Sequence, residues 1–167
     1  MKNKKIVKYL SALAMMVAMM ALAEFTGETE IIFPEIAALT IGLWISNKHI
    51  WQVTDVQLVS LMTLAAIVGV LIVRYSPLPL VINITIAFVV AGVILTSQRS
   101  TLYPLVSALI LPVLLHTTSW VYPLSVLAMT VILVVVKKIF EAKGIRNKTD
   151  YTPSDRPIKL AIVVWAA

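Results

Sequence analysis

The chain has 167 residues, of which 60% are hydrophobic and 13% are charged, and its net charge is +6. Soluble domains carry about 25% charged residues, so this composition, with a mean hydropathy of +0.95, indicates an integral membrane protein. The chain contains no cysteine, which excludes a disulfide, an iron–sulfur cluster, a thiolate zinc site and a thiol nucleophile. The basic residues lie between apolar segments, so their charge reports membrane topology rather than nucleic-acid binding.

Apolar segments of roughly 17 to 20 residues, the length that crosses about 30 Å of hydrocarbon, recur along the chain. The first follows four lysines and ends at Ala21-Leu22-Ala23, which imitates a signal-peptide cleavage site. Because the apolar run is longer than that of a signal peptide and more spans follow, we expect an uncleaved first span. The sequence thus predicts an all-α, polytopic transmembrane helical bundle. Its transmembrane domain covers residues 1–140, with six spans at 6–23, 31–46, 55–73, 80–96, 102–115 and 120–136.

The basic residues predict the orientation of these spans. When the N-terminus is placed in the cytoplasm and six spans alternate, Arg74 is the only one of the fourteen Lys and Arg residues that faces outward. Cytoplasmic loops of membrane proteins are enriched in these residues. We therefore expect a multi-pass protein of the cell inner membrane with a cytoplasmic N-terminus.

Two segments follow the sixth predicted span. Residues 141–157 form a basic cytoplasmic linker, and residues 158–167 begin another apolar run. Ten helical residues reach about 15 Å, half the hydrocarbon thickness. This run is expected to be either the start of a further, truncated span or an interfacial tail.

A short motif occurs twice. Phe33-Pro34-Glu35-Ile36-Ala37-Ala38-Leu39 is echoed 70 residues later by Tyr103-Pro104-Leu105-Val106-Ser107-Ala108-Leu109. Each copy opens a short apolar segment, where proline costs little because the first helical N–H has no intrahelical partner. Three spans fit within the interval, so the second copy enters the membrane from the opposite side. The pattern predicts two three-helix halves related as an inverted repeat.

Glu35 lies near the start of the second apolar segment, where a carboxylate is costly unless it is paired or hydrated. One interpretation is a proton or cation relay. The other is a first-turn glutamate that complements the helix dipole near the headgroups. The sequence leaves both interpretations open.

Five further residues are candidates for a solute pathway. Pro34 and Pro104 could mark broken helices whose N-termini face a solute, or could simply shape helix ends. Ser107 could line a polar path or bond a neighbouring helix. Pro112 lies inside the fifth segment and frees the carbonyl four residues earlier, so it requires a local partner or a kink. His116 could titrate near neutral pH and relay protons, or could lie at the interface.

No Walker loop, HExxH helix, GxSxG turn or dinucleotide glycine motif occurs in the sequence. We therefore expect no enzyme, no metal and no other cofactor. The expected partners are the lipid bilayer and a small solute, not nucleic acid, and the oligomeric state is not predicted. Five aromatic residues are expected to be interfacial anchors: Trp44, Trp51, Tyr75, Trp120 and Tyr122.

Parts of the apolar body resemble the divergent bacterial branch of the HPP family of membrane proteins. The resemblance covers roughly residues 31–136, and it rests on the first copy of the motif with Gly42, on Thr101-Leu102-Tyr103-Pro104 and on Ser119-Trp120-Val121-Tyr122-Pro123-Leu124-Ser125-Val126. The His-Pro-Pro motif of that family falls on residues 102–104, where the last proline alone is kept. Some plant and cyanobacterial members are linked to nitrite transport, so the resemblance implies a transporter of a small anion such as nitrite.

Two main functional hypotheses follow. The first is a transporter or channel for a small solute, with its site between the second and fifth spans. The alternative is a non-transport membrane anchor or assembly subunit, whose basic loop docks a cytoplasmic partner or anionic lipid. A membrane-embedded enzyme is a weaker third hypothesis, because it requires a cluster of ionisable residues at one depth. A transporter needs a polar cavity that water can reach, whereas an anchor packs dry.

Overall fold

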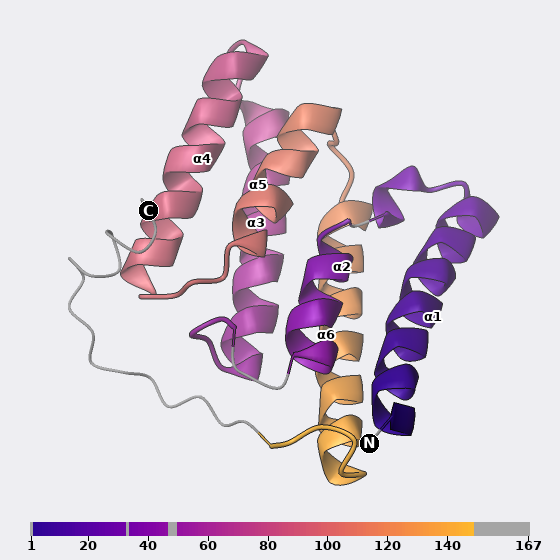
Figure 1. Cartoon of the computed structure of the whole chain (residues 1–167). Helices are drawn as coiled ribbons and strands as arrows, with labels where there is room; N and C mark the ends of the chain where they lie inside the picture. The colour runs from indigo at the N-terminus through magenta and orange to yellow at the C-terminus, as the bar shows by residue number, and fades with distance from the viewer. Residues whose placement is uncertain (1, 33, 47–49, 149–167) are drawn as a thin grey trace.

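A computed structural model describes residues 2–32, 34–46 and 50–148. The regular elements of this part are all helices (Figure 1): α1 (Lys2–Thr26), η1 (Thr29–Ile31), α2 (Glu35–Thr40), η2 (Ile41–Ile45), α3 (Asp55–Tyr75), α4 (Leu80–Ser97), α5 (Pro104–Leu115) and α6 (Val121–Ala142). The first η element is a 3-10 turn, and the second is a π-helical turn that continues α2. The predicted all-helical fold is confirmed. Phe33 of the repeated motif, most of the predicted linker and the final apolar run lie outside the described residues.

The helices differ in length. Four of those described are long and apolar enough to cross a membrane: Asn3–Thr26, Asp55–Tyr75, Leu80–Ser97 and Val121–Ala142. Two apolar helices are shorter, Glu35–Ile45 and Pro104–Leu115. The 12 residues of α5 rise only about 18 Å along the helix axis. The fold is therefore that of a multi-pass membrane protein with four candidate spans and two short apolar helices, which fall on the second and fifth predicted spans.

The two short helices lie at the centre of the bundle. Successive helices run in opposite directions, so that α1 begins and α6 ends on the same side of the molecule (Figure 1). The helix α5 packs against α3 and α4, while α2 with its π-helical turn packs against α1 and α6. The short helices also contact each other, and α3 contacts α6. Each short helix is thus flanked by long ones.

Side chains define where the long helices α3 and α4 begin. Thr54 Oγ1 accepts a hydrogen bond from the Gln57 amide at 3.2 Å, and Gln57 Oε1 accepts one from the Thr54 amide at 3.0 Å. This capping box satisfies two of the N–H groups that a helix start leaves free. At the start of α4, Asn83 closes the preceding turn, because its Nδ2 donates to the Leu78 carbonyl at 3.0 Å and its Oδ1 accepts from Ser76 Oγ at 2.6 Å.

A close approach holds α3 against α5. Ala65 and Ala66 are fully buried in α3, and a Cβ at Gly69 would overlap the Leu109 carbonyl oxygen of α5 and lie 3.0 Å from Pro112 Cγ. Small residues let membrane helices approach in this way. Gly69 is therefore required by packing rather than by backbone conformation.

Pro112 finds its partner on another helix. Proline has no N–H, so it leaves the carbonyl of Ala108, four residues earlier, without its helical hydrogen bond. The buried hydroxyl of Tyr122 donates to that carbonyl at 3.0 Å. The helix α6 thus supplies the local partner that the sequence requires for Pro112.

Candidate functional site

Four of the candidate pathway residues line one pocket. It has a volume of about 610 Å³ and is bounded by Pro34, Glu35, Ala38, Trp51, Tyr103, Pro104 and Ser107. The pocket lies where α2 and α5 begin, and the two helices run in opposite directions through the bundle (Figure 1). The fold therefore brings both copies of the repeated Pro motif to one cavity, which we call the Glu35 pocket.

The carboxyl group of Glu35 is buried but incompletely bonded. The residue is 7% exposed, and its Oε2 has no hydrogen-bond partner. Ser107 lies beside the carboxyl group, but the Ser107 hydroxyl donates to the Pro104 carbonyl at 3.0 Å. A hydroxyl has one proton to donate, so Ser107 does not satisfy both acceptors at once. Buried polar atoms without a partner are uncommon, and the residue that carries this one lines the pocket.

Two loops bring the aromatic residues to this pocket. The Gln52 amide donates to Thr101 Oγ1 at 3.1 Å, which ties the loop before α3 to the loop before α5. Tyr103 follows in the second loop, where its amide donates to the Thr101 carbonyl at 2.9 Å. Trp51 lies in the first loop, and its ring occupies the space that a Cβ at Gly42 would fill. A glycine in the π-helical turn thus allows Trp51 to reach the pocket.

The anchor interpretation of the aromatic residues is wrong for three of them. Trp44, Trp51 and Tyr122 are buried inside the protein, whereas Tyr75 and Trp120 are exposed. Trp44 Nε1 donates to a backbone carbonyl of α6 at 2.9 Å. Tyr122 lies within electrostatic range of the Glu35 carboxyl group. The sequence does indicate a buried donor such as Tyr122, because Pro112 leaves a carbonyl without its helical partner. No comparable pattern in the sequence indicates that Trp51 is buried.

The remaining two pathway candidates lie elsewhere. Pro112 is buried against Gly69 of α3. His116 is exposed at the C-terminal end of α5, in a left-handed backbone conformation with φ of 52°. Neither residue lines the Glu35 pocket.

A second group of charges, the Lys137 cluster, consists of the buried Lys137 and Arg146 and the partly buried Asp55 and Glu141. Lys137 Nζ donates to Asp55 Oδ1. Arg146 Nη1 donates to Glu141 Oε1 at 3.0 Å, and its Nε donates to the Ser46 carbonyl at 3.1 Å. Burial lowers the pKa of the Arg146 guanidinium, and the carboxylates of Glu141 and Asp55 oppose that shift. Arg146, which falls in the expected cytoplasmic linker, is buried and paired, and it ties the chain after α6 to Ser46, the residue that follows η2.

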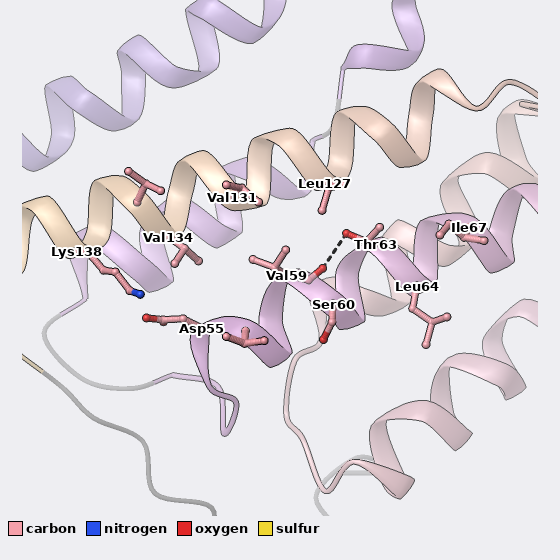
Figure 2. Close-up of a pocket in the computed structure, with 12 residues that line it drawn as sticks. Asp55, Val59, Ser60, Thr63, Leu64, Ile67, Leu127, Val131, Val134 and Lys138 are labelled. Carbon is pink, nitrogen blue, oxygen red and sulfur yellow. Dashed lines mark hydrogen bonds between the residues drawn. The ribbon is translucent and has the colours of Figure 1, made fainter.

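A further cavity of about 570 Å³ lies between α3 and α6. Figure 2 shows that its walls are mostly aliphatic, and that Asp55 and Lys138 lie on facing helices at one end. The hydroxyl of Thr63, drawn with a dashed line, donates to the Val59 carbonyl of its own helix at 2.8 Å. This cavity therefore contributes few polar groups that could fix the orientation of a solute.

Within residues 2–32, 34–46 and 50–148, no group of three His, Asp or Glu side chains could hold a metal ion. No family model, curated protein or solved structure matches the chain. The function must therefore be argued from the geometry of the site.

Proposed function

We propose that the protein is a membrane transporter or channel for a small solute, and that the solute binds in the Glu35 pocket. One observation carries this proposal: Glu35 lines a pocket of about 610 Å³, and its carboxyl group, in a residue more than nine-tenths buried, has an oxygen without a partner. A carboxylate at membrane depth is costly and marks ion or solute pathways. An anchor or assembly subunit has no need of this arrangement.

The proposal includes six membrane crossings, a cytoplasmic N-terminus and two inverted three-helix halves. The packing supports the two related halves. When α1, α2 and α3 are matched in order with α4, α5 and α6, the main helix contacts correspond. The helix α5 packs on α4 and α3, as α2 packs on α1 and α6. Transporters with inverted repeats place their sites where short helices of the two halves meet, and α2 meets α5.

Single cysteines test this topology directly, because the chain has none of its own. We would introduce Gly27→Cys, Ile50→Cys, Leu78→Cys, Gln98→Cys and Thr118→Cys, one in each loop, and label intact cells with an impermeant maleimide. Six crossings predict labelling at positions 27, 78 and 118 only. If α2 enters and leaves on one side, positions 27 and 50 label alike, which would refute six crossings.

Solute flux in proteoliposomes tests the function. Nitrite, other small anions, protons and small organic cations would be screened, with Glu35→Gln beside the wild type. Glu24→Gln is the matched control, because Glu24 is exposed near the end of α1. Flux that Glu35→Gln abolishes and Glu24→Gln retains supports the proposal, and wild-type protein that moves no solute contradicts it.

The family assignment remains part of the proposal. If the chain is a divergent HPP-family member, nitrite is the first solute to test. For that reason nitrite is in the screen. The proposal assigns no catalytic step and no cofactor to the chain.

A further inference from the structure

We propose that the Glu35 pocket binds a small organic cation, an ammonium group that carries apolar substituents. This inference rests on the proposed function, because it names the substrate class of the same site. It differs from the small anion that the family resemblance implies. Three features of the pocket support it: its formal negative charge, its shortage of free hydrogen-bond donors and its aromatic walls.

The formal charge of the pocket is negative. Among the described residues that line it, Glu35 is the one that carries a formal charge. A bound anion would face this carboxylate without a lining Lys or Arg to offset the repulsion. A bound cation would instead compensate the charge of Glu35. Such pairing offsets the desolvation cost of a carboxylate at membrane depth.

The helix N-termini at the pocket offer few free donors. An N-terminus binds an anion through unpaired backbone N–H groups. Here most amides of the first turns already donate hydrogen bonds within the protein. In α2 the Glu35 amide bonds its own carboxyl group and the Ala37 amide donates to the Pro34 carbonyl at 3.2 Å. In α5 Pro104 has no N–H, and the next two amides donate at 3.0 Å each, Leu105 to the Leu102 carbonyl and Val106 to the Tyr103 carbonyl.

The walls favour an organic cation over a metal ion. Trp51 and Tyr103 line the pocket with Glu35, and aromatic faces attract cations, Trp most strongly. An unhydrated K⁺ needs a shell of several oxygen ligands, whereas the side chains of this pocket combine one carboxyl group and the hydroxyls of Ser107 and Tyr103 with prolines, an alanine and two aromatic rings. Its volume of about 610 Å³ falls in the usual range for small-molecule sites.

Equilibrium binding to the full chain in nanodiscs tests the inference without requiring flux. The probe is radiolabelled tetraethylammonium, with K⁺, methylammonium and nitrite as competitors. We expect tetraethylammonium to bind more tightly than K⁺, and Glu35→Gln to weaken it by about tenfold or more, since a desolvated charge pair is lost. Trp51→Phe, which keeps a ring with a weaker face, should weaken it roughly threefold.

Glu24→Gln should bind tetraethylammonium as the wild type does, and a single symmetric gel-filtration peak establishes that each variant is folded. Equal binding by the wild type and Glu35→Gln, or no binding by folded wild-type protein, would overturn the inference. Nitrite binding that Glu35→Gln strengthens would also overturn it, while leaving the proposed transport function intact. Absence of flux for every solute refutes the proposed function instead, whatever the binding result.

Discussion

Two groups of buried charge in this bundle differ in how completely they are paired. In the Lys137 cluster, Lys137 bonds Asp55, and Arg146 bonds both Glu141 and a backbone carbonyl. In the Glu35 pocket, a buried carboxyl group keeps an oxygen without a partner. Charges that satisfy one another hold helices together, whereas a charge left unsatisfied beside a cavity remains available to a ligand.

The difference also separates stability from function. Removing one member of a paired, buried group leaves its partner uncompensated, which is strongly destabilising. Neutralising a buried carboxyl group that has an oxygen without a partner relieves a desolvation cost instead. Substitutions in the Lys137 cluster should therefore lower stability without directly affecting solute binding. Substitution of Glu35 should weaken solute binding with little effect on stability.

The largest expected effect is that of Lys137→Ala. Lys137 is 3% exposed and bonds Asp55, so its removal should lower the free energy of unfolding by about 3 kcal/mol. Titration with SDS in detergent micelles would measure it. The neighbouring Lys138 is exposed, and Lys138→Ala should change the value by less than about 0.5 kcal/mol. Equal, small effects of the two variants would show that the Lys137 cluster is not structural.

Glu141→Gln should have an intermediate effect. The amide oxygen of Gln can still accept a hydrogen bond from Arg146, but the charge that compensates the buried guanidinium is lost. Hydrogen bonds to charged groups contribute about 1.5–3 kcal/mol, so we expect a loss near the lower end of that range in the same titration. If Glu141→Gln were as stable as Glu24→Gln, the pairing at the end of α6 would contribute nothing.

Tyr122→Phe should have a smaller effect. It removes the hydroxyl that bonds the Ala108 carbonyl freed by Pro112, and such hydrogen bonds between membrane helices average about 0.6 kcal/mol and reach about 1.7 kcal/mol. We expect a loss of about 1 kcal/mol in the SDS titration. Tyr75→Phe, at an exposed tyrosine, is the control and should leave stability unchanged. A loss above that of Lys137→Ala would mean that Tyr122 does more than cap this carbonyl.

Local sequence patterns predicted much of the helical fold. Apolar runs, prolines and charged loops marked where helices begin and end, and Pro34, Glu35, Pro104 and Ser107 were grouped by one repeated motif. The structure brings these four to one pocket. Such patterns are local, since helix formation and proline geometry depend on near neighbours in the chain.

Other parts of the site depend on contacts between distant segments. Trp51 reaches the pocket because Gly42 leaves space for its ring, and Arg146 is buried because Glu141 and the Ser46 carbonyl bind it. Neither residue has a neighbouring pattern that distinguishes it from an interfacial tryptophan or a solvated arginine. Burial of these amphipathic side chains is decided by tertiary packing, which a single sequence does not display.

The smallest expected change in stability is that of Glu35→Gln. Because Glu35 Oε2 has no partner to lose, the free energy of unfolding should change by less than about 0.5 kcal/mol, the range typical of substitutions that break no specific contact. Any gain would follow from a lower desolvation cost, as is common when a functional group is removed. The same variant should lose solute binding, which none of the Lys137-cluster variants is expected to do directly. A destabilisation as large as that of Lys137→Ala would instead place Glu35 among the structural charges, because a carboxyl group that holds the fold together must have partners in the folded state.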